Sequence, residues 1–221
     1  MEYYVIKRTI DFILALIGLI VLMPVFLILA AAIKFESKGP VFFKQKRVGK
    51  GKTYFNILKF RTMRIDTPQD TPTHLLLNPE QYITRIGKFL RKTSLDEIPQ
   101  IWNIFIGEMS IVGPRPALWN QYDLIAEREK YGANDVLPGL TGWAQINGRD
   151  ELTIETKARF DGEYVQGMNF AFDCRCFWGT ILCVLKSEGV IEGGTSKVEN
   201  EDTKRVIGVA SEENSGKRLE V

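Results

Sequence analysis

The sequence predicts an α+β fold that is mostly helical, with a small β-hairpin, an N-terminal re-entrant membrane helix and amphipathic helices in the membrane interface. Three observations predict it: residues 10–33 are almost entirely apolar, two β-rich runs flank a Gly-Lys-Gly turn in residues 41–63, and later segments have helical spacing. The 221 residues suit an anchor and one globular domain. We place the anchor in residues 1–38, the domain in residues 39–192 and a polar, disordered tail in residues 193–221.

The anchor segment Ile10–Ile33 has the length of a helix that crosses the hydrocarbon core, and Asp11 is its one charged residue. A cleaved signal peptide is disfavoured because the run is too long and no small-x-small site follows it. A straight spanning helix stays open. A helix that enters and returns on the same side is favoured by Pro24, which kinks the run at mid-depth, and by basic residues at both ends. These flanking residues are Lys7, Arg8, Lys34 and Lys38.

The formal net charge of +2 hides an asymmetry. The stretch from Lys34 to Arg64 contains ten basic residues and one acidic residue, Glu36, which makes +9 there and −7 over the rest of the chain. Such a block attracts anionic lipid headgroups, at roughly 1 kcal/mol per basic residue, and it also attracts phosphorylated ligands. The nearly balanced total does not indicate a nucleic-acid-binding protein.

The cysteines and the histidine limit the cellular compartment and the metal chemistry. Cys174, Cys176 and Cys183 are odd in number and lie in one apolar stretch, which is not a secretory disulfide framework and indicates reducing cytoplasm. With His74 as the one histidine and a Cys-x-Cys that lacks partners, we expect no zinc or iron site.

Beyond the hairpin, the sequence predicts short helices separated by loops rich in glycine and proline. Helices are expected at residues 83–90, 96–105, 117–131, 152–166 and 171–186. Loops are expected at residues 65–80 and 136–149, and the Pro-flanked Arg115 should lie in a rigid turn. The last helix is strongly apolar but too short to span a bilayer, so it lies either in the core or in the membrane interface.

The carboxylate pair Asp96-Glu97 allows two interpretations. Ser94 and Glu97 have the spacing of a capping box, in which each side chain bonds to the backbone of the other residue at a helix start. Pro99 makes a plain capped helix less natural. Adjacent carboxylates on a helix point about 100° apart, so one could act as a nucleophile while the other acts as a base.

Four motifs in this order carry a resemblance to a known family: KFRTM at residues 59–63, RKTSLDEIPQIWN at 91–103, GEMSIVGPRP at 107–116 and PGLTGWAQINGR at 138–149. They follow an apolar N-terminal segment. The chain resembles the bacterial sugar transferases, the monotopic phosphoglycosyl transferases, in the short form that is little more than the catalytic domain. The resemblance covers nearly all of residues 1–190.

The resemblance implies transfer of a sugar 1-phosphate from a UDP-sugar to polyprenol (undecaprenyl) phosphate, with UMP as the second product and Mg²⁺ as cofactor. It implies that Asp96 attacks the β-phosphate, forms a phosphosugar-aspartyl ester and also contacts the metal. The role of Glu97 stays open between metal contact, activation of the lipid phosphate and holding Asp96. The enzyme would work at the cytoplasmic face of the bacterial cell membrane, in the first membrane step of glycoconjugate assembly.

The resemblance also suggests substrate-binding residues: Lys59 and Arg91 near phosphates, Arg115 near the nucleotide, and in addition Arg149 and Asp161. Structural alternatives stay open for three of them, because Arg115 could satisfy loop carbonyls and Arg149 and Asp161 could each belong to a salt bridge. Trp143 fits a core or interface anchor better than a base-stacking platform. The implied partners are the UDP-sugar, polyprenol phosphate and membrane lipids, with a homodimer or downstream glycosyltransferases left open.

Overall fold

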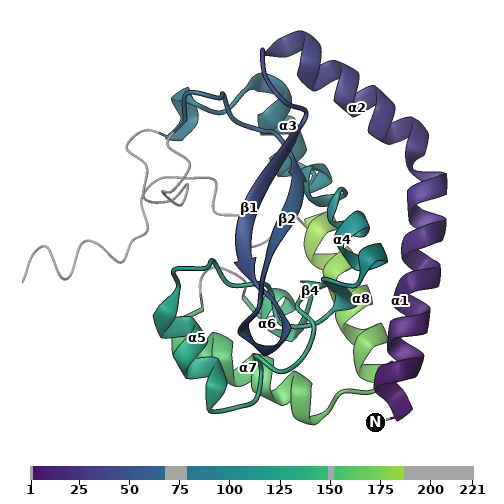
Figure 1. The fold of residues 1–221 in the computed structure, drawn as a ribbon, viewed down its shortest axis with the longest axis vertical. Helices are drawn as coiled ribbons and strands as arrows, with labels where there is room; N and C mark the ends of the chain where they lie inside the picture. Colours follow the sequence, from purple (N-terminus) through teal and green to yellow (C-terminus); the bar gives the residue numbers. More distant parts are fainter. Residues whose placement is uncertain (1, 68–78, 149–151, 187–221) are drawn as a thin grey trace, which may run out of the picture. The chain divides into compact units, whose positions relative to one another are not determined.

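The computed structural model of the chain describes residues 2–67, 79–148 and 152–186. The described residues within 2–67 and 81–186 belong to one compact unit. Along the chain, the helices and strands are α1 (Glu2–Val21), α2 (Met23–Glu36), β1 (Phe42–Val48), η1 (Lys50–Lys52), β2 (Tyr54–Phe60), η3 (Pro79–Gln81), α3 (Arg85–Lys92), η4 (Leu95–Glu97), α4 (Gln100–Ile106), β3 (Ser110–Val112), α5 (Tyr122–Glu129), β4 (Gly139–Thr141), α6 (Trp143–Ile146), α7 (Ile154–Gln166) and α8 (Phe170–Lys186) (Figure 1). The predicted fold, mostly helical with a small hairpin, is confirmed.

The N-terminal apolar segment forms two helices. α1 ends at Val21, α2 begins at Met23, and the two helices are bent by 60° at this break. Pro24 lies in the first turn of α2, where its missing N–H costs least. Among the described residues no single helix is long and apolar enough to cross a membrane, whereas this bent pair passes the same test together. The predicted kink is therefore confirmed.

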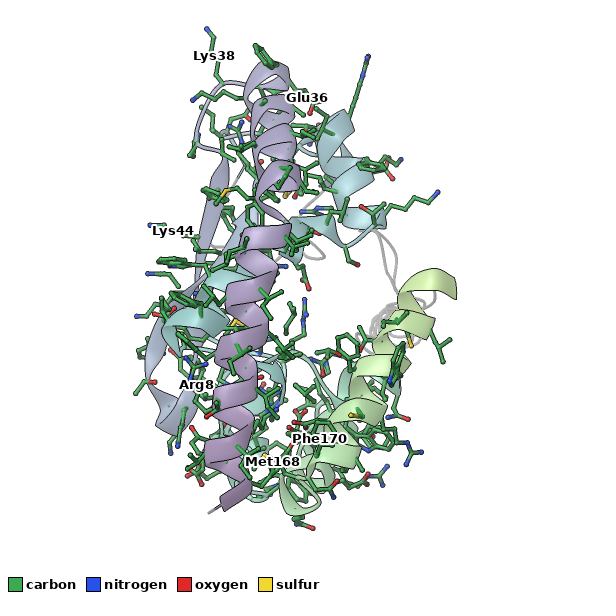
Figure 2. The ribbon with its side chains drawn as sticks, turned by 90° about the vertical axis from the view of Figure 1, so that its right-hand side faces the viewer. Arg8, Glu36, Lys38, Lys44, Met168 and Phe170 are labelled. Atoms are coloured by element: carbon green, nitrogen blue, oxygen red, sulfur yellow. The ribbon has the colours of Figure 1, made fainter. Side chains whose placement is uncertain are left out.

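Both anchor helices also pack against the rest of the unit. α1 lies along α4, where Phe12 stacks on Phe105 with 5.0 Å between ring centroids. α2 buries Ile33 against Phe60 and Leu90. Figure 1 shows the bend between the two helices, and in the view of Figure 2 they form one column along the length of the unit. Elsewhere they expose large apolar side chains: Val5, Ile6, Ile13, Leu14, Ile17, Ile20, Val21, Met23, Leu27, Ile28 and Phe35.

The start of α1 is held to α8 by a polar network. The carboxylate of Asp173 accepts hydrogen bonds from Lys7 Nζ and Tyr3 Oη, both at 2.6 Å, and from Tyr164 Oη at 2.7 Å. Lys7 is buried in this network. Its charge is therefore compensated by Asp173 inside the protein. Lys7 is thus a structural residue that attaches α1 to α8, in addition to its expected place at the flank of the membrane segment.

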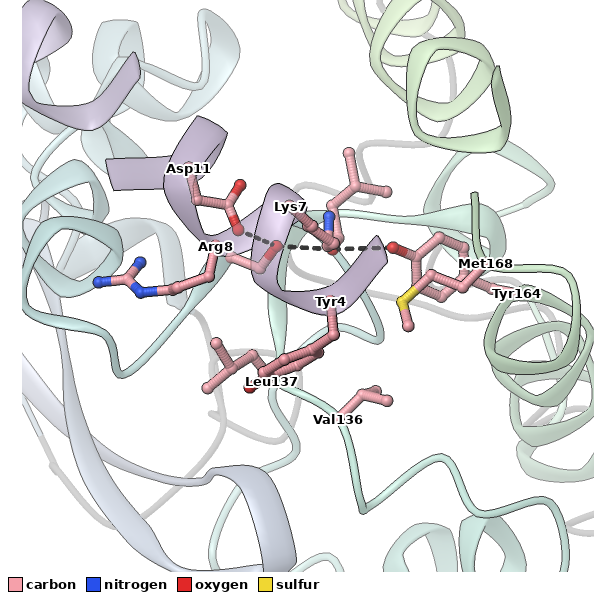
Figure 3. A pocket seen from close by; sticks show the side chains of 10 residues that line it. Tyr4, Lys7, Arg8, Asp11, Val136, Leu137, Tyr164 and Met168 are labelled. Carbon is pink, nitrogen blue, oxygen red and sulfur yellow. Dashed lines mark hydrogen bonds between the residues drawn. The ribbon is translucent and has the colours of Figure 1, made fainter. Parts of the chain in front are cut away.

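Asp11, the one charged residue inside the apolar run, also contacts the rest of the unit. Asp11 is buried and accepts hydrogen bonds from Ser110 Oγ at 2.7 Å and from the backbone N–H of Ile111 at 3.1 Å. A pocket lies here, with residues of α1 such as Tyr4 facing Val136 and Leu137 (Figure 3). The polar side chains of α1 in this pocket form hydrogen bonds to other side chains and to the backbone, so the residues around the pocket attach α1 to the rest of the unit.

The predicted hairpin is confirmed. β1 and β2 pair antiparallel over all seven residues of each strand. The turn between them is η1, in which Gly51 has a left-handed backbone with φ of 61°. Phe55 and Ile57 point inward from β2 and pack with Ile104 and Met109 in the core.

Two of the expectations for local structure are wrong. Residues 136–149, expected as a loop, contain β4 and α6, and β4 pairs parallel with β3 in a second sheet. The helix expected at 117–131 is confined to Tyr122–Glu129. In both places the tertiary pairing of short segments, rather than local propensity, decides the structure.

The helices expected at 152–166 and 171–186 are confirmed as α7 and α8. α8 buries Cys176 against Val112 and Tyr164 and exposes Phe177 and Trp178, so it is a core helix with an apolar outer face. The helix expected at 83–90 is α3, displaced by two residues. Most of the loop expected at 65–80, and the whole of the tail expected at 193–221, lie outside the described residues.

Candidate active site

The pair Asp96-Glu97 lies in a short turn between two helices. α3 ends at Lys92, η4 covers Leu95–Glu97, and α4 begins after Pro99. Ser94 has a left-handed backbone with φ of 55°, which turns the chain sharply and is uncommon for a residue with a side chain. The single helix expected at 96–105 is therefore split into η4 and α4.

The capping box is wrong for this segment. The Ser94 side chain makes no cap hydrogen bond, and the N–H of Glu97 instead donates to the backbone carbonyl of Ser94 at 3.2 Å. The Glu97 carboxylate points toward two cations rather than back to the Ser94 backbone. Pro99 immediately precedes α4, and α4 likewise begins without a side-chain cap.

Glu97 joins two basic residues that come from distant parts of the chain. Its Oε1 lies 2.7 Å from Lys59 Nζ at the end of β2 and 2.6 Å from Arg115 Nη2 in the Gly113–Pro116 turn. Arg115 Nη1 lies 3.4 Å from Oε2, so the guanidinium faces both carboxylate oxygens. Three sequence motifs thus meet at one carboxylate.

Asp96 is buried and held less tightly. Its Oδ2 lies 3.9 Å from Lys59 Nζ, and among the described residues its carboxylate has no side-chain hydrogen bond. Burial raises the pKa of Asp96, the neighbouring Glu97 charge raises it further, and the charges of Lys59, Arg91 and Arg115 oppose the rise. A carboxylate with a raised pKa and few partners is the more basic and nucleophilic of the two.

Glu97 has the opposite electrostatics. Burial favours its protonated form, but the charges of Arg115 and Lys59 and the hydrogen bonds from both outweigh burial and hold the pKa of Glu97 well below its usual range. Glu97 is therefore ionised at neutral pH and a poor proton acceptor. The structure favours a role in orienting Lys59 and Arg115 over a role as general base.

Arg91 is oriented by a residue that the sequence reasoning did not single out. Its Nε donates to Thr62 Oγ1 at 2.9 Å, and Thr62 is a buried residue two positions after the end of β2. The carbonyl of Thr62 accepts from the N–H of Thr84 at 3.0 Å, and a Cβ on Gly87 would lie 2.0 Å from that carbonyl oxygen. The close approach that Gly87 permits fixes α3, and with it Arg91, against the end of β2. The place of Thr62 in the KFRTM motif was the feature of the sequence that could have indicated its role.

The turn that carries Arg115 rests on the motif at residues 138–149. A Cβ on Gly139 would lie 2.1 Å from the N of Gly113, and one on Gly142 would lie 2.1 Å from its carbonyl oxygen. Neither position has room for a side chain, so the two backbones touch directly. Gly113 N donates to the carbonyl of Thr141 at 2.8 Å, which completes the parallel β3–β4 pairing beneath Arg115.

The other predicted residues are placed elsewhere or are not described. Arg149 lies outside the described residues. Asp161 of α7 is buried and forms an ion pair with Arg128 of α5, with 2.6 Å between Oδ2 and Nη2. The Trp143 ring packs 5.0 Å from Phe172 between centroids, and its Nε1 donates to a glutamate of α7, which agrees with the core interpretation.

The carboxylates at this turn fit a magnesium ion only in part. Among the described residues, no group of three or more histidine, cysteine, aspartate or glutamate side chains could hold a metal ion. Mg²⁺ in phosphate-transfer sites takes one or two protein carboxylates and completes its shell with substrate phosphates and water. Asp96, which lacks the tight ion pairs of Glu97, has the donor chemistry for that arrangement.

Comparison with known proteins gives a consistent result. Residues 2–187 match the family model described as bacterial sugar transferase. The chain is 40% identical over 192 residues to the UDP-glucose:undecaprenyl-phosphate glucose-1-phosphate transferase of Xanthomonas campestris pv. campestris, a match that covers 83% of this chain and 40% of that protein. It is 38% identical to the uncharacterized sugar transferase EpsL of Bacillus subtilis, over 84% of this chain and 90% of EpsL. It is 36% identical to the exopolysaccharide production protein ExoY of Rhizobium meliloti, over 83% of this chain and 87% of ExoY.

The chain thus spans less than half the length of the Xanthomonas relative and most of the length of the other two.

Proposed function

Because this chain belongs to the bacterial sugar transferase family, we propose that it transfers a sugar 1-phosphate from a UDP-sugar to polyprenol phosphate and releases UMP. The supporting relative is the undecaprenyl-phosphate glucose-1-phosphate transferase named above. The observation that carries the proposal is the adjacent carboxylate pair with opposite pKa shifts, surrounded by Lys59, Arg91 and Arg115. Such a pair separates a reactive carboxylate from one that orients cations.

In the first step, an Asp96 carboxylate oxygen attacks the β-phosphorus of the UDP-sugar. The bond between that phosphorus and the bridging oxygen breaks, UMP leaves with the electron pair, and a phosphosugar-aspartyl ester remains. Lys59 and Arg115, held by Glu97, lie where they can neutralise phosphate oxygens as negative charge collects there. Arg91, oriented by Thr62, supplies a third cation on the side of α3.

In the second step, an oxygen of polyprenol phosphate attacks the same phosphorus. The bond to Asp96 breaks, the carboxylate is restored, and polyprenol-diphosphate sugar forms. The lipid phosphate is already an anion, so this step requires no proton acceptor. A step without a proton acceptor agrees with Glu97, whose lowered pKa keeps it ionised at neutral pH. When bound, Mg²⁺ would neutralise diphosphate charge, with Asp96 as the protein ligand.

The anchor explains how the two substrates meet. The bent pair α1–α2 has the composition of a membrane-inserted segment, and Phe89 and Trp102, close in sequence to Asp96, are exposed apolar residues. We place these surfaces in the cytoplasmic face of the cell membrane, where the lipid phosphate emerges and a UDP-sugar arrives from the cytosol. α8 adds Phe177 and Trp178 as a further interfacial surface.

The test of the two-step route uses the purified chain and a UDP-sugar without lipid. A burst of UMP equal to the amount of enzyme is expected, because the aspartyl ester forms and then waits for the acceptor. Asp96→Asn should abolish both the burst and the transfer, while Asp123→Asn, which neutralises an exposed carboxylate at the start of α5, should leave them unchanged.

Two other outcomes would replace the proposal. Transfer that requires both substrates at once, without a burst, would indicate direct displacement in a ternary complex. A chain that binds UDP but turns over no UDP-sugar would be a membrane-anchored nucleotide-sugar-binding protein.

A further inference from the structure

The two halves of the anchor are attached to the two helices that flank Asp96. At the end of α2, Glu36 Oε1 accepts a hydrogen bond from the N–H of Arg85 at 2.7 Å, and Glu36 Oε2 accepts from the N–H of Ile86 at 3.1 Å. These are the first two N–H groups of α3, and Thr84 Oγ1 accepts from the third, that of Gly87, at 2.9 Å. The start of α3 is thus capped by the end of the membrane hairpin.

α1 makes the corresponding attachment at the far end of α4. Arg8 Nη1 donates to the carbonyl of Ile104 at 2.6 Å, and Arg8 Nη2 donates to that of Phe105 at 2.9 Å. These carbonyls belong to the last turn of α4, where a positive charge is favoured by the helix dipole. Gly107, with φ of 93°, ends α4, and a Cβ there would lie 3.1 Å from Arg8 Nη2. Figure 2 labels Arg8 and Glu36 far apart on the anchor column.

The segment between these attachments carries the reactive groups. It runs from α3, with Arg91 in its last turn, through the left-handed Ser94 and the turn of Asp96-Glu97 into α4. We infer that Arg8 and Glu36 are positioning residues for the transfer, an inference that rests on the proposed function. Glu36 holds the start of α3 and Arg8 holds the end of α4, and the Asp96-Glu97 turn connects these two helices.

The surroundings of the Glu36 contact favour positioning over plain stabilisation. Glu36 is exposed, so water would satisfy the N–H groups of Arg85 and Ile86 if its carboxylate were removed. The cost in stability is therefore small, whereas a displacement of about 1 Å at a reacting group can reduce a rate by roughly a hundredfold. Ser94, between the two helices, has a left-handed backbone, a conformation that persists only where the surrounding structure holds it.

The experiment compares Arg8→Gln and Glu36→Ala in the full chain, reconstituted in vesicles that contain polyprenol phosphate. Asp123→Ala is the matched control, since it also removes an exposed carboxylate from the start of a helix. Arg8→Lys and Glu36→Gln, which keep one donor or acceptor, should retain more activity. Hydrogen exchange of the backbone amides of residues 94–98 is measured alongside the transfer of sugar phosphate.

Each single variant should lose roughly tenfold in kcat with faster exchange at residues 94–98 and unchanged exchange in α7. Because release of either end frees the same turn, the double variant should lose less than the product of the two single losses. Losses that multiply, or exchange that changes only next to the substituted residue, would overturn the inference. If the wild type transfers no sugar phosphate but the exchange pattern is found, the proposed function fails and the attachment stands.

Discussion

Replacing Asp161 with alanine tests whether this residue acts on substrate or holds the fold. In the structure its side chain is 1% exposed and that of its partner Arg128 is 5% exposed, with 2.6 Å between Oδ2 and Nη2. A second bond joins Arg128 Nε to the same oxygen at 2.8 Å. Removing the carboxylate leaves a buried guanidinium without its counter-charge, which costs about 3–5 kcal/mol.

The pKa of Asp161 sharpens that expectation. Burial raises the pKa of the carboxyl, and the Arg128 charge and hydrogen bond oppose the rise. Because desolvation offsets much of the attraction in a buried ion pair, well-packed apolar residues of similar volume often stabilise a fold equally well. Because the pKa of Asp161 is raised in the folded protein, its contribution to the free energy of unfolding should fall as the pH rises through that pKa. The double variant Asp161→Leu with Arg128→Met should therefore recover most of the stability that Asp161→Ala loses.

The assay is thermal unfolding of the purified chain, followed by transfer rates at low temperature normalised to the folded fraction. For a chain of this size the Asp161→Ala variant should melt roughly 6–20 °C lower, since 1 kcal/mol corresponds to about 2–4 °C. Its normalised transfer rate should match that of the wild type. An unchanged melting temperature together with lost transfer would refute the structural assignment and return Asp161 to the substrate-binding residues.

Two further predictions concern the site and the anchor. Lys59→Gln removes a charge that lowers the pKa of Asp96, so the acid limb of kcat/KM, where Asp96 becomes protonated and the rate falls, should move to higher pH; a pH profile with an unmoved acid limb would contradict this. A single cysteine at position 2, in a chain without Cys174, Cys176 and Cys183, should be protected from an impermeant thiol reagent in intact cells and labelled after lysis. Position 2 is preferred to Tyr3, whose hydroxyl bonds to Asp173, and labelling in intact cells would exclude a same-side return of the anchor.

The features that the sequence predicts correctly depend on local chemistry. Pro24 cannot donate a backbone hydrogen bond, so a break in the apolar run near it follows from the residue alone. The hairpin follows from β-rich runs around a glycine turn, and Gly51 takes the left-handed backbone that such a turn needs. Lys59, Arg91 and Arg115 lie near Asp96 in the structure, whereas the substrate-binding role that the family motifs suggest for them stays a prediction.

The features that the sequence does not predict depend on partners far along the chain. β3 and β4 have three residues each and pair next to Gly113 and Gly139, whose missing side chains let the two backbones approach closely. Ser94 and Glu97 have the spacing of a capping box, but Glu97 bonds instead to Lys59 and Arg115, 38 and 18 residues away. Arg8 has the position of a membrane-flanking charge, yet its acceptors are carbonyls 96 and 97 residues away.

The division of roles between the two carboxylates follows from where their cations come from. Lys59 ends a strand that is fixed in the core, and Arg115 lies in a turn that is fixed by glycine contacts, so Glu97 meets both without moving either. Glu97 forms ion pairs with both cations, and its negative charge also raises the pKa of the neighbouring Asp96. A carboxylate that is more basic than usual is a better nucleophile, and in the proposed first step Lys59 and Arg115 would neutralise the oxygens of the attacked phosphate. In the proposed mechanism the adjacency of the two carboxylates has a function, because the charge of Glu97 raises the pKa of Asp96 while its carboxylate holds Lys59 and Arg115 beside the site.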